Sequence, residues 1–207
     1  MKNIFKVVVI FIICTCTSVA QEEGDFTFSI FAGGGFSNIS TSEDQNLAES
    51  RLSLSAGVLG TYYFSKSWSL RSGVAYEQQG WTNGVYVSDG GFVNDDANYG
   101  LHYISISVQP EFHFGSKNNK NWYVNAGPYY SFLAGANADT TQVKRFFENS
   151  DIGLAGGLGY KISFDNKTNS ALFFELVSRK GLTNIGKEND SENVTNSKFG
   201  LLVGYTF

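Results

Sequence analysis

Residues 101–114 read LHYISISVQPEFHF, and this stretch decides the fold class. Successive side chains of a strand point to opposite faces. One face here is apolar: Ile104, Ile106, Val108, Phe112 and Phe114. The other face is small and polar: Ser105, Ser107, Gln109, Glu111 and His113. A soluble barrel turns its apolar face inward, whereas large apolar side chains opposite a polar row suit strands that face lipid around a crowded polar lumen.

The same alternation recurs along the chain and divides it into eight segments. We expect strands at Phe26–Ser37, Arg51–Phe64, Trp68–Trp81, Leu101–Phe114, Trp122–Ala136, Asp151–Phe164, Ala171–Thr183 and Lys198–Phe207. Their connections alternate in length. Long stretches lie at Asn38–Ser50, Thr82–Gly100, Asn137–Ser150 and Asn184–Ser197, and short ones at Ser65–Ser67, Gly115–Asn121 and Asp165–Ser170. Long loops on one side and short turns on the other are typical of an outer-membrane barrel. The sequence therefore predicts an all-β, eight-stranded antiparallel up-and-down transmembrane β-barrel.

Composition supports an all-β protein and excludes two other classes. The 207 residues include 23 Gly, 18 Phe and 11 Tyr but only 2 Pro, which is an aromatic and glycine enrichment typical of barrels. A net charge of −4 excludes a nucleic-acid binder that relies on a large basic surface. A mean hydropathy of −0.14 excludes a bundle of apolar membrane helices.

Aromatic residues gather at the ends of the expected strands. Phe64, Trp68, Trp122 and Phe207 lie beside short turns, and Trp81 and Phe132 lie towards the long connections. Amphipathic rings at two water–lipid interfaces would produce two such bands. We therefore expect Trp68, Trp81 and Trp122 to be interface aromatics.

The first twenty residues have the layout of a signal peptide. Lys2 and Lys6 precede a short apolar run, and Ser18-Val-Ala20 offers small residues before Gln21. Both cysteines lie inside this segment, and neither follows the small residue that lipidation requires. We expect cleavage after Ala20, leaving residues 21–207 as one barrel domain without cysteine in the bacterial outer membrane.

Several motifs resemble the PorT-like outer-membrane β-barrel family of Bacteroidetes-type bacteria. They are Tyr123-Val-Asn-Ala-Gly-Pro-Tyr129, Gly156-Gly-Leu-Gly-Tyr160, the stretch from Leu172 to Ile185, and Phe199-Gly-Leu-Leu-Val-Gly-Tyr-Thr-Phe207. The resemblance implies an eight-stranded barrel inserted by the barrel-assembly machinery, with Tyr205 and Phe207 in its recognition signal. The family has no general catalytic residues, and some members are linked to protein secretion.

Alternation places a set of charged residues on the lumen side. They are Arg51, Arg71, Glu77, Glu111, His113, Lys161, Glu175 and Arg179. An eight-stranded barrel is just wide enough for its own side chains to fill it, and buried charges need partners. We expect an ion-paired plug that makes the lumen impassable; the alternative is an ion or proton pathway.

The sequence leaves three functions open. The first is a non-enzymatic barrel whose loops serve surface architecture, adhesion or a secretion-accessory role. The second is a lipid-modifying enzyme that uses His113 with Glu111 and lumenal serines, and the third is a carrier or narrow channel for a small or apolar ligand. We expect no cofactor and no metal. Expected partners are outer-membrane lipid and lipopolysaccharide, the assembly machinery, and a surface or secretion partner at the loops.

Overall fold

The computed structural model describes residues 24–41, 48–87, 91, 93–117, 120–164, 170–187 and 193–207. The expected signal peptide, 1–20, lies outside these residues. Eight long strands are present: β1 Phe26–Ser40, β2 Glu49–Tyr63, β3 Trp68–Val87, β4 Val93–Lys117, β5 Lys120–Ala138, β7 Ser150–Ser163, β8 Ala171–Gly181 and β9 Thr195–Thr206. The two-residue β6 (Thr141–Gln142) and the 3₁₀ turn η1 (Lys144–Phe146) lie between β5 and β7. No helix among the described residues is long and apolar enough to span a membrane.

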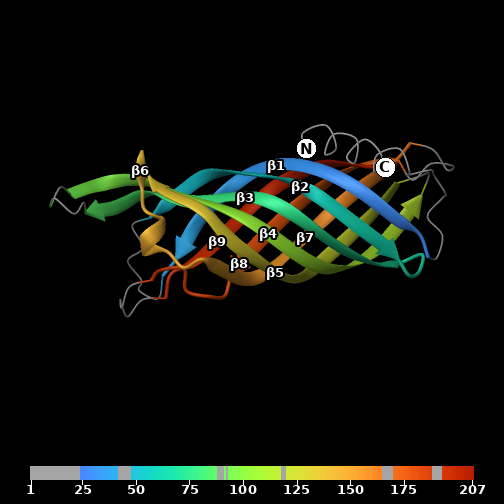
Figure 1. The fold of residues 1–207 in the computed structure, drawn as a ribbon. Helices are drawn as coiled ribbons and strands as arrows, with labels where there is room; N and C mark the ends of the chain where they lie inside the picture. Colours follow the sequence, from blue (N-terminus) through green and yellow to red (C-terminus); the bar gives the residue numbers. More distant parts are fainter. Residues whose placement is uncertain are drawn as a thin grey trace, which may run out of the picture.

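The long strands form one closed antiparallel ring (Figure 1). Each pairs with its neighbours in the chain, and β1 closes the ring against β9, with Phe36 opposite Phe199. At one end the connections are short, as between β2 and β3, where the Ser65 hydroxyl accepts a hydrogen bond from the Trp68 amide at 3.0 Å. The expected eight-stranded up-and-down barrel is confirmed. We call its two ends the short-turn end and the long-loop end.

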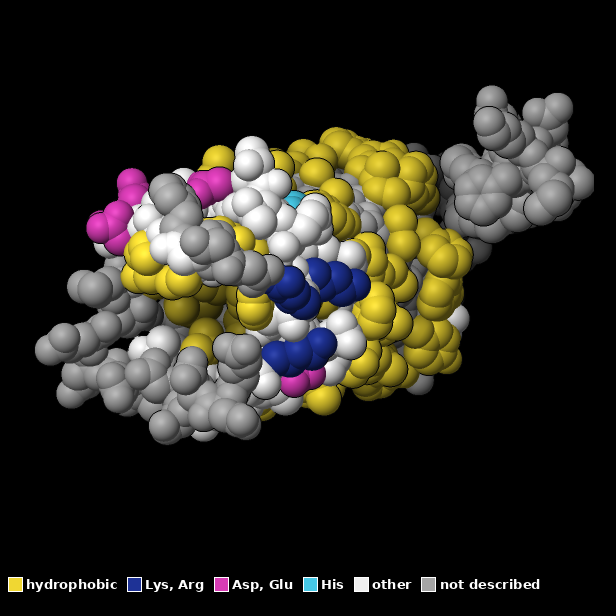
Figure 2. All heavy atoms as spheres, turned by 60° about the vertical axis from the view of Figure 1, so that its left-hand side comes forward, with side chains coloured by type: hydrophobic (Ala, Val, Ile, Leu, Met, Phe, Trp, Pro, Cys, Tyr) yellow, Lys and Arg dark blue, Asp and Glu magenta, His cyan; other side chains and the backbone are white. Residues whose placement is uncertain are grey.

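The outward face is an apolar belt. Large hydrophobic side chains from every long strand are exposed around the ring, among them Ile30, Leu54, Val74, Ile106, Val124, Leu158, Leu176 and Leu201. Figure 2 shows this belt as a broad yellow surface that gives way to polar and charged side chains towards the long-loop end. Polar residues occupy the alternate, inward positions, so the barrel is inverted relative to a soluble one.

Of the four long loops predicted from the sequence, the one at Thr82–Gly100 is wrong. The stretch Thr82–Gly100 contains little loop, because β3 runs on to Val87 and β4 begins at Val93, and the two strands pair as far as Val87 opposite Val93. This hairpin projects past the rest of the barrel (Figure 1). The register shifts at Trp81 and again at Gly84, which breaks the regular alternation there and hides the strand from a period-2 pattern.

Candidate functional site

Arg71 is the centre of a buried charge cluster near the short-turn end. Its Nη1 and Nη2 donate to the Glu175 carboxylate at 2.6 and 2.9 Å, and its Nη1 also lies 3.3 Å from Glu111. The strand positions explain why these three side chains come together. Arg71 lies on β3 and Glu111 on the neighbouring β4, and Glu175 reaches from β8 across the lumen. Two-pronged arginine–carboxylate pairs are strong and geometrically specific. We call Arg71, Glu111 and Glu175 the turn-side ion cluster.

Other side chains surround this cluster. The Tyr123 hydroxyl donates to Glu175 at 2.8 Å and the Asn125 amide donates to it at 3.2 Å. His113 Nε2 lies 3.0 Å from Glu111. Lys161 is also buried, and its ammonium donates to the Tyr63 hydroxyl at 2.7 Å. Glu175 therefore has a cation and two neutral donors, and Glu111 has the Arg71 cation and the His113 ring beside it, so neither buried carboxylate is left unpartnered.

Glu77 organises a second cluster nearer the long-loop end. Its carboxylate lies 3.0 Å from Arg179 and 2.7 Å from Lys198, and the Ser55 hydroxyl donates to it at 2.7 Å. The Arg179 guanidinium lies 3.9 Å from the centre of the Tyr129 ring, close enough for a cation–π contact. We call Glu77, Arg179 and Lys198 the loop-side ion cluster.

Two charged lumen residues escaped the sequence analysis. Lys198 precedes Phe199, whose outward position on β9 sends Lys198 inward, so alternation contained the signal. Asp151 begins the inward row of β7 and accepts hydrogen bonds from Asn196 at 3.0 Å and Tyr129 at 3.1 Å. With these two included, the buried cations Arg71, Lys161, Arg179 and Lys198 balance the buried acids Glu77, Glu111, Asp151 and Glu175.

An apolar layer separates the two ion clusters. Phe31, Ala75, Val177 and Leu202 pack together there, with Leu59 against them. The cavity at this level has a volume of about 40 Å³, room for about three water molecules. Members of both ion clusters line this cavity, so the described part of the lumen leaves space for only a few water molecules between them.

Gly159 makes room for one of the plugging side chains. A Cβ at this position would overlap the Tyr123 ring, which lies over the glycine. We expect Gly159→Val to lower the free energy of unfolding by about 1–3 kcal/mol, because overpacking displaces Tyr123 from Glu175. Urea unfolding in lipid vesicles measures this. Gly135→Val is the control, since its nearest neighbouring atom lies 3.9 Å away, and equal losses for both variants would contradict the account.

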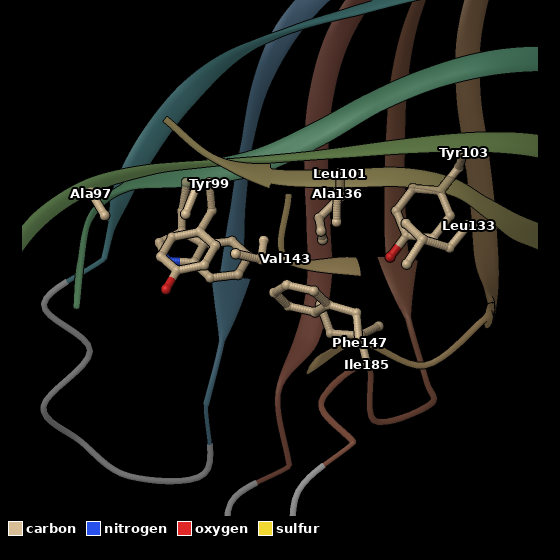
Figure 3. Close-up of a cluster of buried hydrophobic side chains, with 11 residues drawn as sticks. Ala97, Tyr99, Leu101, Tyr103, Leu133, Ala136, Val143, Phe147 and Ile185 are labelled. Carbon is tan, nitrogen blue, oxygen red and sulfur yellow. The ribbon is translucent and has the colours of Figure 1, made fainter. Parts of the chain in front are cut away.

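The long-loop end holds a cap of buried apolar side chains (Figure 3). We call it the mouth cluster, and its members are Trp81, Ala97, Tyr99, Leu101, Tyr103, Leu133, Ala136, Ala138, Val143, Phe147 and Ile185. Trp81 stacks on Tyr99 with ring centres 4.5 Å apart, and Phe147 meets both rings edge-on. The Tyr99 hydroxyl donates to the Val85 carbonyl at 2.8 Å, and burial raises the pKa of Tyr99.

Two expected residue roles need correction. Trp81 is not an interface aromatic: it is 7% exposed and points inward with Glu77 and Gln79, the alternate positions of β3. Arg51 joins neither ion cluster: its Nη1 donates to the Tyr99 carbonyl at 2.6 Å near the rim. Arg51 does lie on the predicted inward side of β2, at an alternate position to the buried Ser53 and Ser55, but it lies nearer the rim than either ion cluster.

The remaining expected positions lie around the short-turn end. Trp68 and Trp122 are 46% and 44% exposed on the apolar belt, where they pack against Phe112 and Tyr160. Tyr205 and Phe207 also face outward, with ring centres 5.0 Å apart. These are the places that amphipathic rings occupy at a membrane boundary.

Ser69, which the sequence analysis did not single out, meets His113 and Glu111 in the lumen. Its hydroxyl lies 3.1 Å from His113 Nε2 and 3.2 Å from Glu111. A hydrolytic triad needs the acid on one ring nitrogen and the nucleophile on the other. Here Nε2 faces both groups, and Nδ1 makes no hydrogen bond to any part of the chain that the structure describes. Among the described residues, no group of three His, Cys, Asp or Glu side chains is placed to hold a metal ion.

Comparison with known proteins agrees with this architecture. A family model described as "Outer membrane protein beta-barrel domain" matches residues 19–187. The structure of Neisserial surface protein A is similar, with a TM-score of 0.51 and 19% identity over 87% of this chain and 97% of that one. Outer membrane protein OprG from Pseudomonas aeruginosa is similar too, with a TM-score of 0.50 and 16% identity over 91% of this chain and 99% of that one. No curated protein sequence matches the chain.

Proposed function

Because the chain belongs to the outer membrane protein β-barrel domain family and is a bacterial outer-membrane barrel, we propose that it acts without catalysis as a closed scaffold. Its filled lumen blocks passage, and its long-loop end makes the contacts of surface architecture, adhesion or secretion. The observation that carries this proposal is the contrast between the lumen at membrane level and the long-loop end of the barrel. The membrane-level lumen is packed and charge-paired, whereas the β3–β4 hairpin extends beyond the ring.

The finer parts of the proposal rest on the sequence motifs. We assign the chain to the PorT-like barrels of Bacteroidetes-type bacteria, with residues 1–20 as a cleaved signal peptide. The belt contacts outer-membrane lipid and lipopolysaccharide, and Tyr205 and Phe207 guide insertion by the assembly machinery. Their outward position at the end of β9 supports that last role, because Phe207 is exposed and Tyr205 half-buried at the barrel wall.

External proteolysis of intact cells tests the surface role. A protease recognition sequence inserted after Gly91, at the end of the β3–β4 hairpin, should be cut by protease added outside. The same insertion after Ser65, in a short turn, should be cut only after the outer membrane is broken. The opposite pattern would place the hairpin in the periplasm and contradict the proposal. Faster gel migration of unboiled samples confirms that both variants fold.

The enzymatic alternative predicts a different result for His113. In our proposal His113 is a structural partner of Glu111, so His113→Ala leaves the lipid composition of the outer membrane unchanged. Mass spectrometry of membrane lipids from cells with and without the variant measures this. Loss of a lipid product in His113→Ala, with the barrel still folded, would favour the lipid-modifying enzyme instead.

A further inference from the structure

A large cavity opens at the long-loop end, above the filled lumen. Its volume is about 550 Å³, within the range of about 300–1,000 Å³ that small-molecule sites occupy. Its walls come from four parts of the chain: the end of β1, the β3–β4 hairpin, the segment after η1, and the connection between β8 and β9. The lining residues that matter here are Trp81, Val85, Val87, Tyr99, Phe147 and Lys187.

The walls of this cavity are more apolar than polar although they lie outside the lipid belt. Trp81, Tyr99 and Phe147 form a packed aromatic group, so the shape is set before any ligand arrives. Val85 and Val87 nevertheless remain exposed, at 61% and 56%. Apolar surface left open to water inside a concave site gains free energy when an apolar molecule covers it.

The floor of the cavity is closed. Below the aromatic group lie Leu101, Leu133 and Ile185 of the mouth cluster, each 0% exposed. The ion clusters fill the lumen further down. A molecule that enters from outside therefore stops at the mouth, and the site serves binding rather than axial passage.

The charge of the lining residues indicates which class of ligand the cavity would bind. Lys187 is the one charged residue among the described residues that line the cavity, and it is exposed. The polar groups beside it are already engaged: the Asn184 side-chain oxygen accepts from the Gly186 and Val194 amides at 3.2 and 3.0 Å. A cation at the rim of an apolar cup complements a molecule with an apolar body and an anionic end.

We propose that this cavity binds a small amphipathic carboxylate, a medium-chain fatty acid in type, from the cell exterior. The aliphatic body packs on Trp81, Phe147 and the two valines, and the carboxylate pairs with Lys187. The site is separate from the ion clusters, so the inference does not depend on the scaffold role.

Trp81 reports on this site directly. The chain has 3 tryptophans, and in a W68F/W122F background the fluorescence comes from Trp81 alone. Titration of this full-length barrel in lipid nanodiscs with 8-bromooctanoate should quench Trp81 and saturate, because bromine quenches on contact. The neutral 8-bromooctan-1-ol is the matched probe without charge.

Variants distinguish the site from random collision. Val87→Phe fills the cavity and should weaken binding of 8-bromooctanoate about tenfold. Val58→Phe is the control, since Val58 is about as exposed, at 53%, but lies on the apolar belt and does not line the cavity. Val85→Phe repeats the test if Val87→Phe does not fold, as judged by gel migration. Lys187→Gln should weaken the carboxylate about threefold, the size of an exposed ion pair, and leave the alcohol unchanged.

Two results would overturn the proposal. Quenching that rises linearly with concentration, with equal slopes for Val87→Phe and Val58→Phe, would show collision rather than a site. Saturation with equal affinity for carboxylate and alcohol, unaltered by Lys187→Gln, would contradict the anionic ligand.

Discussion

Replacing Arg71 with methionine is expected to cost about 3–5 kcal/mol of unfolding free energy, which is the usual penalty for breaking a buried ion pair from one side. Arg71 touches both Glu175, at 2.6 Å, and Glu111, at 3.3 Å. Its removal leaves two buried carboxylates close together with their shared cation gone. Urea unfolding of the barrel in lipid vesicles, followed by tryptophan fluorescence, measures the loss.

Two further variants show whether the loss comes from charge. Arg145→Met removes an exposed arginine on η1 and should change stability by no more than about 0.5 kcal/mol. Glu175→Gln combined with Arg71→Met should cost less than the sum of the two single variants, because the residues interact directly. Additive costs would mean that the pair contributes by packing alone.

Glu77→Gln carries the second large expected effect, about 2–4 kcal/mol of destabilisation. Glutamine keeps the shape of the side chain and removes the charge that holds Arg179 and Lys198 together. Among the described residues, no other carboxylate lies within ion-pair distance of either cation. The same urea titration measures the effect.

The partner residue supplies the check on this prediction. Lys198→Gln in the Glu77→Gln background removes one of the two unbalanced cations and should recover part of the lost stability. Glu49→Gln, at the exposed start of β2, is the control. A Glu77→Gln barrel as stable as the Glu49→Gln barrel would show that the loop-side ion cluster does not support the fold.

Strand positions were predictable because successive residues of a membrane-spanning strand face lipid and lumen alternately, which leaves an apolar–polar alternation in the sequence. The expected Lys198–Phe207 strand ends within one to three residues of the bounds of β9. The polar row predicted to face inward on β4 is buried there, as for Ser105 and Glu111. The same rule places Arg71, Glu77 and Glu175 inside. Which of them pair was not predictable, because Arg71 and Glu175 lie 104 residues apart and meet across the lumen.

The rule fails where the strand itself is irregular. The register shifts after Trp81 and Gly84, and this irregular part of the β3–β4 hairpin leaves no period-2 signal. Arg51 was placed on the correct, inward face, but the sequence did not show that it lies at the rim, where it donates to the Tyr99 carbonyl. Trp81 was predicted to lie at the membrane interface because of its residue type. Its alternate position in the strand, with Glu77 and Gln79, instead indicated that it faces the lumen. The mouth cavity depends on four separate segments, so it appears only when the chain is folded.

Planar-bilayer recording of the purified barrel tests the central claim, a closed barrel whose lumen is filled. The barrel is delivered to the bilayer in lipid vesicles. Its insertion into these vesicles is verified first, by flotation of the protein with the lipid and by faster gel migration of unboiled samples. The account predicts that inserted protein adds no stepwise current at either polarity, because both ion clusters and the apolar layer between them close the lumen. Reproducible single-channel steps that scale with voltage would show an open path through the barrel and contradict it.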